Sequence, residues 1–303
     1  MEYDDKVSVI GTYKGRLMLF IIELCKDDYV CKKAVDLGKE DETAVHSIIN
    51  TDNSVYLADS FNNKIFKYNY IFNELYEETV GRDPRHMCII DDNMYVANFE
   101  SDNISVIDMS NFTMTESIPA GIKPHDVLYD KNNDRLYICC YEENELIEYS
   151  RKHELKRRFT TDGKPMHMFE SDGSIILMTY FANGTIHTKI NFINIEEGKI
   201  EKIITIEGLA SDFDLDFEKN LLYVLNIEDK NLYIIDITKK ETVKTVYLGG
   251  YPESLTVGEK YVYVTNSKKN QINAIDKNEL IIDRSINLNF TPSCIKLISE
   301  FQK

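Results

Sequence analysis

The 303-residue chain lacks several things that common protein classes require, beginning with basic charge. It holds 35 Lys and Arg against 51 Asp and Glu, for a formal net charge of −16. Nucleic-acid binders draw affinity from basic side chains that neutralise phosphates, so we expect no nucleic-acid partner. The same charge disfavours an anionic membrane surface. Trp is absent, but 19 Tyr and 14 Phe supply aromatic bulk for a core.

Long apolar runs and an export signal are also missing. The run Leu17–Ile22 is far too short to span a bilayer, and the acidic start MEYDDKVSVIG has no basic or apolar leader region. The six Cys are irregularly spaced and form no Cys-x-x-Cys pair, which favours reduced thiols. These features predict a cytoplasmic protein, and we expect a monomer.

The chain carries no Gly-x-Ser-x-Gly, P-loop or Gly-x-Gly-x-x-Gly in a suitable context, but it does repeat itself. A β-prone tripeptide with a central Tyr or Ile recurs at steps of 39, 42, 39, 47 and 40 residues, which is the length of a four-stranded propeller blade. The central residues are Tyr56, Tyr95, Tyr137, Ile176, Tyr223 and Tyr263. The step of 47 comes from a longer loop at 181–188, which we expect to act as a partial lid.

The ends of the chain are incomplete in complementary ways. Three strands are predicted near the N-terminus and one spare strand near the C-terminus, so together they make one four-stranded blade. We therefore predict an all-β, seven-bladed β-propeller in a single domain, 1–303, with a composite blade of 1–38 plus 290–299. The other six blades are expected to start near residues 44, 84, 124, 165, 210 and 252.

Two segments resemble a known family. Tyr263-Val-Thr-Asn266 is a literal YVTN, and Met94-Tyr-Val-Ala-Asn98 fits the same template. The chain resembles YVTN-type β-propellers, which are similar to WD40 propellers in blade architecture. The resemblance implies a fold; relatives of this kind include lactonases, a lyase, surface-layer proteins and binding scaffolds, so it does not select a function.

Histidines gather at one position of the repeat. Two residues after the Pro that usually opens the first strand of a blade, the chain has His46, His86, Asp126, His167, Asp212, Ser254 and Cys294. His125 stands beside Asp126. In a propeller these first strands are innermost, so the side chains should line one mouth of the central channel.

Three interpretations of this cluster stay open. His and Asp are ligands for a divalent transition metal, and the predicted metal ligands are His46, His86, Asp126 and His167. The same residue types suit metal-free acid–base chemistry, with His86 and His167 as catalytic residues. A polar channel mouth with no chemistry is the third interpretation.

Basic and aromatic residues are expected around the same mouth. The predicted ligand-binding residues are Arg85, Lys123, His125, Lys164, Tyr13, Phe99, Tyr141 and Tyr180. The basic members could hold an anionic group and the aromatic ones could pack on an organic ligand. His153, in an outer turn, is expected to be solvated.

Two functions follow. The first is a small-molecule site, metal-dependent or not, with hydrolase, lyase or isomerase chemistry on an anionic ligand. The second is a protein-interaction scaffold without chemistry.

Overall fold

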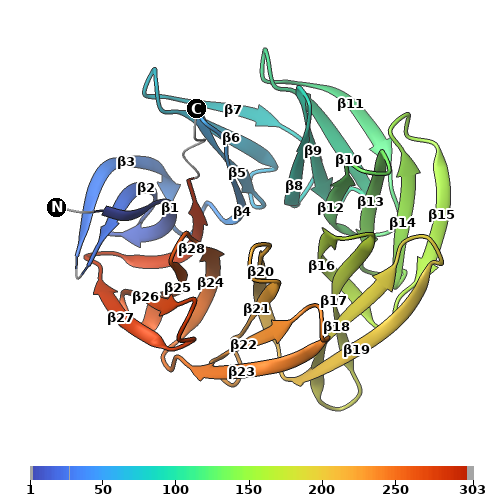
Figure 1. The fold of residues 1–303 in the computed structure, drawn as a ribbon. Helices are drawn as coiled ribbons and strands as arrows, with labels where there is room; N and C mark the ends of the chain where they lie inside the picture. Colours follow the sequence, from blue (N-terminus) through green and yellow to red (C-terminus); the bar gives the residue numbers. More distant parts are fainter. Residues whose placement is uncertain (1–2, 27, 299–303) are drawn as a thin grey trace. The chain divides into compact units, whose positions relative to one another are not determined.

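Seven four-stranded antiparallel sheets make up the computed structural model, which describes residues 3–26 and 28–298 (Figure 1). One sheet has the order β28-β1-β2-β3 and joins the last strand to the first three. Its strands are β28 (Thr291–Leu297), β1 (Tyr3–Tyr13), β2 (Arg16–Cys25) and β3 (Tyr29–Lys39). The predicted seven-bladed propeller, closed by a C-terminal strand that pairs with β1, is thereby confirmed. Residues 1, 2, 27 and 299 of the predicted composite blade lie outside the described residues.

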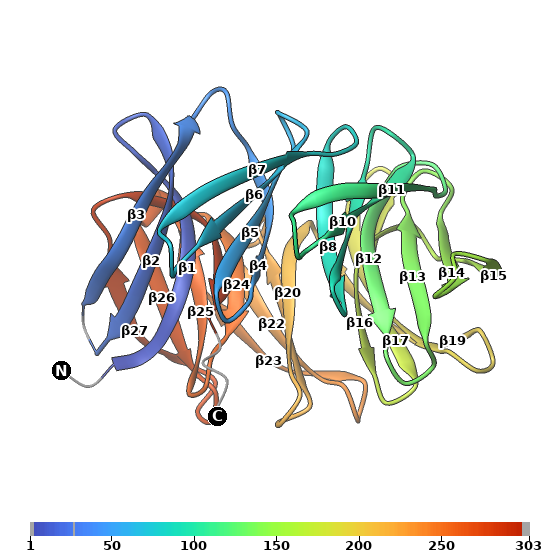
Figure 2. The ribbon, with the colours of Figure 1, turned by 90° about the horizontal axis from the view of Figure 1, so that it is seen from above.

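In each of the other six sheets, strands that are neighbours in the sheet are consecutive in the chain. Figure 2 shows this for β12, β13 and β14. Their strands are β4 (Val45–Asn50), β5 (Ser54–Asp59), β6 (Lys64–Asn69), β7 (Glu74–Thr79); β8 (Pro84–Ile90), β9 (Asn93–Asn98), β10 (Asn103–Asp108), β11 (Thr113–Pro119); β12 (Pro124–Asp130), β13 (Arg135–Cys140), β14 (Glu145–Ser150), β15 (Leu155–Thr160); β16 (Lys164–Ser171), β17 (Ser174–Ala182), β18 (Ile186–Asn194), β19 (Lys199–Glu207); β20 (Ala210–Asp216), β21 (Leu221–Asn226), β22 (Asn231–Asp236), β23 (Glu241–Tyr247); and β24 (Pro252–Val257), β25 (Tyr261–Asn266), β26 (Gln271–Asp276), β27 (Ile282–Asn287). A 3₁₀ turn, η1 (Ser267–Lys269), lies between β25 and β26.

Contacts divide the chain into two compact units. The first comprises 1–56, 68–74 and 208–303, and the second comprises 57–67 and 75–207. The sheets β8–β11, β12–β15 and β16–β19 belong to the second unit. The first unit contains the composite sheet and the sheets β20–β23 and β24–β27.

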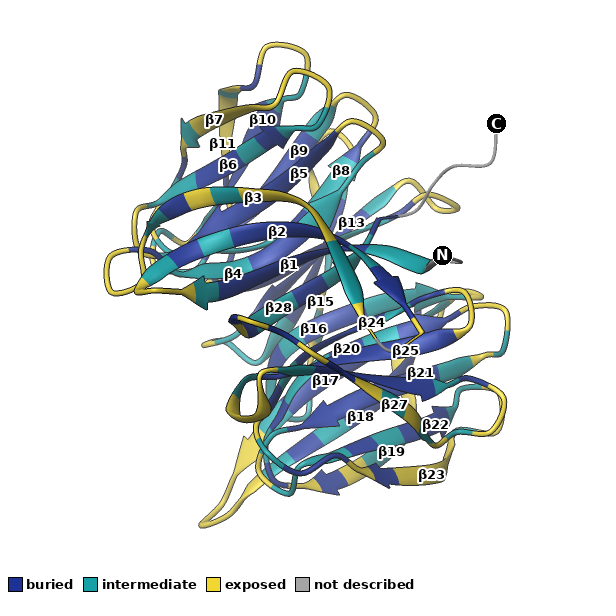
Figure 3. Cartoon of the chain, turned by 90° about the vertical axis from the view of Figure 1, so that its left-hand side faces the viewer, coloured by how far each residue is buried: buried dark blue, intermediate teal, exposed yellow. Residues whose placement is uncertain are grey.

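Burial changes from the middle strands to the outer strand of each sheet (Figure 3). All six residues of β25 are buried, whereas β23 is exposed at every position except Val246. A middle strand packs on both faces, and its run of Val, Ile and Tyr suits that environment.

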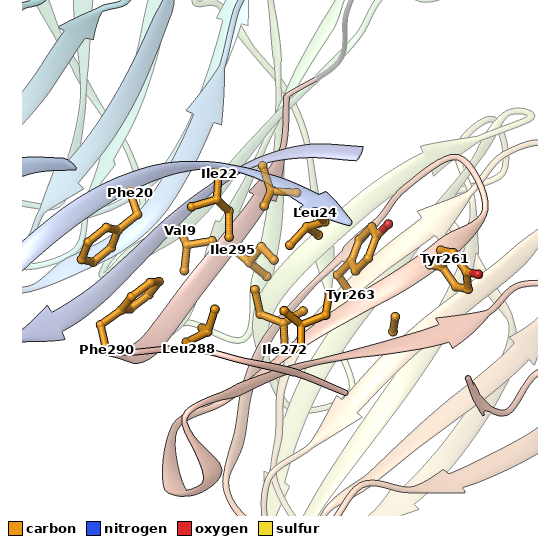
Figure 4. Close-up of a cluster of buried hydrophobic side chains, with 13 residues drawn as sticks. Val9, Phe20, Ile22, Leu24, Tyr261, Tyr263, Ile272, Leu288, Phe290 and Ile295 are labelled. Carbon is orange, nitrogen blue, oxygen red and sulfur yellow. The ribbon is translucent and has the colours of Figure 1, made fainter. Parts of the chain in front are cut away.

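One cluster of the first unit shows how neighbouring sheets share a core (Figure 4). The rings of Phe20 on β2 and Phe290 before β28 stack with centroids 3.8 Å apart. Tyr263 of the YVTN segment is fully buried in the same cluster, and its hydroxyl donates to Asp5 on β1 at 2.9 Å. The Tyr of the repeat therefore packs in the core and also binds the N-terminal strand.

The extra residues near 181–188 lengthen a hairpin. Strands β17 and β18 each contain nine residues, and their pairing continues to Ala182 and Ile186. The expected lid loop is thus a continuation of the sheet, because antiparallel pairing satisfies the backbone of the insertion. Among the described residues, no helix is long and apolar enough to cross a bilayer.

Candidate metal centre

Three side chains of types that bind metals lie close together in the second unit. Each comes from the first strand of one of three consecutive sheets. They are His86 on β8, Asp126 on β12 and His167 on β16. One ligand atom from each side chain lies within 4.8 Å of the other two. Asp126 and His167 are 8% exposed, and His86 is half-buried. The structure thus brings three of the four predicted metal ligands together within one unit.

An irregularity in the sheet positions each of these residues. The pairing register shifts between Pro84 and Met87, between Pro124 and Asp126, and between Pro165 and His167. A bulge of this kind changes the direction of the side chain next to it. Pro is tolerated at the first position of a strand because no hydrogen bond from its nitrogen is needed there. The Pro that opens the strand therefore precedes the bulge that carries the site.

His125 adds a third imidazole to the group. Its ring centroid lies 5.2 Å from that of His86 and 5.1 Å from that of His167, while the rings of His86 and His167 are 4.5 Å apart. Nδ1 of His125 donates to the carbonyl oxygen of Met166 at 2.9 Å. Because a carbonyl only accepts, the proton of the neutral ring is on Nδ1 and the lone pair is on Nε2. His125 is 1% exposed.

Asp126 has a structural task that the sequence did not reveal. Its Oδ2 accepts the N–H of Met168 on β16 at 3.0 Å, and its Oδ1 accepts the N–H of Val127 at 2.8 Å. In the first unit Asp212 does the same, accepting from Leu255 on β24 at 3.0 Å and from Phe213 at 2.8 Å. Each carboxylate oxygen has a second lone pair, so this bonding leaves capacity to bind an ion.

Burial shifts the pKa of two members of the group in opposite directions. It raises the pKa of Asp126 to about 7, against the opposing effect of the two backbone N–H groups. It lowers the pKa of His167 to about 4. His167 is therefore a neutral imidazole near pH 7, which is the form that binds metals.

An aromatic pair borders the imidazoles. The ring of Phe99 lies 5.9 Å from that of His125 and 5.6 Å from that of Tyr141. Cations lie over both aromatic rings: Arg85 and Lys123 are 4.7 and 5.1 Å from the centre of the Phe99 ring, and Lys164 lies over the Tyr141 ring. These predicted ligand-binding residues are thus neighbours within the second unit.

Each of the predicted basic residues is paired with an acid. Arg85 contacts Asp83 at 2.7 Å, and Lys123 contacts Glu100 at 3.2 Å. Lys164 lies 4.6 Å from the centre of Tyr141 and contacts Glu142 at 3.2 Å. Each ion pair offsets part of the positive potential that the sequence predicts here. The acid is close in the chain only for Arg85, because Glu100 and Glu142 come from the loops after β9 and β13.

The other predicted residues are described by the strand and the unit to which they belong. His46 on β4 and Tyr13 at the end of β1 belong to the first unit, and their participation stays a prediction. Tyr180 lies on β17 and is half-buried. His153 is less solvated than expected: its side chain is 19% exposed, and its Nε2 lies 3.1 Å from the Tyr95 hydroxyl of the neighbouring sheet.

Comparison with known proteins supports the fold. No family model and no curated protein matches the chain. Among solved structures, AztD of Citrobacter koseri superimposes with a TM-score of 0.69 at 12% identity, covering 100% of each chain. Hydrazine synthase of Kuenenia stuttgartiensis gives a TM-score of 0.68 at 17% identity, over 79% of this chain and 78% of that one.

A third similar structure is longer than this chain. The dihydro-heme d1 dehydrogenase NirN, in complex with DHE, superimposes with a TM-score of 0.68 at 15% identity. The match covers 95% of this chain but only 65% of NirN. TM-scores of this size at such low identity show a shared seven-bladed propeller fold and do not identify a function.

Proposed function

We propose that the protein binds a divalent transition-metal ion through His86, Asp126 and His167. The observation that supports this most directly is the convergence of their three ligand atoms within 4.8 Å. Each residue comes from a different sheet, so chance clustering along one strand does not account for it. A neutral His167 and a carboxyl that ionises beside a cation provide the required protonation states.

The donor set narrows the choice of ion. Two imidazole nitrogens and one carboxylate oxygen suit Zn²⁺, Mn²⁺, Fe²⁺, Co²⁺ or Ni²⁺, whereas Ca²⁺ and Mg²⁺ prefer oxygen donors. Zinc ligands stand about 2.0–2.2 Å from the metal, so small side-chain rotations must bring the donor atoms closer. Within the second unit, His125 is the candidate for a further ligand, since its ring lies 5.2 and 5.1 Å from those of His86 and His167.

We assign a small-molecule site to the same place, with His86 and His167 as its reactive residues. The wall of Phe99 and Tyr141 beside His125 supports this, because ligand sites combine apolar surface with a few polar groups. An anionic ligand would have to displace Asp83 or Glu100 from its cation. Hydrolysis, elimination and isomerisation are the reaction types in question. A cytoplasmic, monomeric state remains a prediction from the sequence.

Metal analysis of untagged protein tests the site. We expect about one equivalent of metal after incubation with Zn²⁺, Co²⁺ or Ni²⁺ and gel filtration, measured by inductively coupled plasma mass spectrometry. The double variant His86→Ala/His167→Ala should lose it. The double variant His153→Ala/His187→Ala removes two histidines outside the group and should keep it. Wild-type protein without bound metal would contradict the proposal and favour the non-catalytic scaffold.

A further inference from the structure

Equivalent residues of the first unit join three inner strands directly. Asp212 on β20, Ser254 on β24 and Cys294 on β28 occupy the repeat position that His86, Asp126 and His167 occupy in the second unit. The Ser254 hydroxyl donates to Asp212 at 2.8 Å and lies 3.7 Å from the Cys294 sulfur. The three strands belong to three different sheets, so these side chains cross two boundaries between sheets.

Backbone groups complete this connection. The N–H of Leu255 donates to Asp212 at 3.0 Å, and the N–H of Ile295 donates to Ser254 at 3.4 Å. One hydrogen-bonded chain therefore runs from β20 through β24 to β28. The inner strands of separate sheets have no backbone hydrogen-bond ladder between them. The side chains of Asp212 and Ser254 therefore supply the hydrogen bonds that connect these three strands.

The second unit shares only part of this hydrogen-bonded arrangement with the first unit. Asp126 accepts from Met168 as Asp212 does from Leu255. Where Ser254 stands in the first unit, the second has His167, whose ring meets that of His86 edge to face at 83°. The three side chains converge on a common point instead of forming a short hydroxyl-to-carboxylate bond.

We propose that an ion at this point is a structural link that ties β8, β12 and β16 together, so that metal occupancy controls the local stability of the second unit. The idea rests on the proposed metal site and adds a consequence to it. An ion that binds only the folded arrangement stabilises it in proportion to occupancy. The first unit, which has its own hydrogen-bonded chain, should not respond.

Hydrogen exchange of the full chain measures this directly. Peptides covering β8, β12 and β16 are compared with peptides covering β20, β24 and β28, with Zn²⁺ or with a chelator. At free Zn²⁺ about 100 times the dissociation constant, we expect exchange in the first set to slow by about 100-fold, and exchange in the second set to stay unchanged. Stoichiometric zinc binding without selective protection would refute the link and leave the metal site intact. Absence of zinc binding would refute both.

A substitution that copies the first unit gives a second test. His167→Ser places a hydroxyl opposite Asp126, as Ser254 stands opposite Asp212. This variant should show protection of β12 and β16 without metal and should no longer respond to Zn²⁺. His167→Ala, which supplies neither ligand nor hydroxyl, should exchange rapidly in both conditions. If His167→Ser still gained protection from Zn²⁺ as the wild type does, the ion would not be acting through this residue and the link would be wrong.

Discussion

Asp126 has one observed role and one proposed role, and paired substitutions separate them. As a strand link it accepts the backbone N–H groups of Met168 and Val127, and as a ligand it would bind the ion. We consider Asp126→Asn and Asp126→Ala, with Asp212→Asn and Asp212→Ala as matched controls. Asp212 makes the same backbone bonds in the first unit, far along the chain from the histidines.

The expected magnitude follows from the hydrogen bonds. Asn keeps one carbonyl oxygen and can accept one of the two N–H groups, whereas Ala accepts neither. A buried donor left unsatisfied costs about 1–3 kcal/mol. The Asn variant should therefore exceed the Ala variant in free energy of unfolding by about 1–3 kcal/mol at both positions. Comparing Asn with Ala also removes the carboxyl ionisation from the difference, since neither side chain titrates.

Urea unfolding followed by far-UV circular dichroism and Tyr fluorescence gives the stability of each variant. Coincident transitions from the two probes would justify a two-state treatment. Zinc affinity is measured on the same preparations by competition with a chromogenic chelator. Both substitutions of Asp126 should weaken zinc binding by at least about tenfold, and both substitutions of Asp212 should leave it unchanged.

Two results would refute this reasoning. Equal stability of the Asn and Ala variants at both positions would show that the backbone bonds contribute little. Wild-type zinc affinity in Asp126→Asn would show that the carboxylate links strands without binding the ion, and the ligand set would then have to include His125.

Two further predictions concern the first unit. The ammonium of Lys277 lies 2.8 Å from the carboxylate of Asp216, and their side chains are only 6% and 2% exposed. Because Lys277→Met leaves a buried carboxylate without its partner, it should lower the free energy of unfolding by about 3–5 kcal/mol in urea titrations. Adding Asp216→Asn removes that charge and should recover part of the loss. Burial raises the pKa of Asp212 from 3.8 to about 6. Between about pH 4 and pH 6 the folded chain therefore keeps a proton that the unfolded chain has lost, so the free energy of unfolding falls as the pH rises through this range. Asp212→Asn should reduce the difference in urea midpoint between about pH 4.5 and 6.5; an unchanged difference would contradict the assignment.

The repeat made the fold predictable because every blade is a four-stranded sheet whose middle strands are buried in the same way. Tyr263 and its equivalents are large, β-prone and central to middle strands, so their spacing alone reveals the blade length. The spare C-terminal strand was equally clear, since the first three strands alone leave the composite blade one strand short of four. The insertion after Tyr180 was misjudged, because a longer loop and a longer hairpin have the same length in sequence.

The candidate site was predictable only in part. Position in the repeat identifies His86, Asp126 and His167, since the bulge after each opening Pro recurs with the repeat. What each side chain binds depends on groups distant in sequence. The Met168 N–H that binds Asp126 is 42 residues away, and no local pattern signals it.

The contrast between the units explains why this position is polar in most blades. First strands of different sheets cannot share a backbone ladder, yet they must be held together, so each needs a side-chain acceptor for the next strand. Asp212 and Ser254 meet this need with their own oxygen atoms. A histidine at the same position has a ring that accepts less readily from a neighbouring backbone but binds metals well. A polar position kept for structural reasons can therefore acquire a metal site by substitution, without any change to the strands that support it.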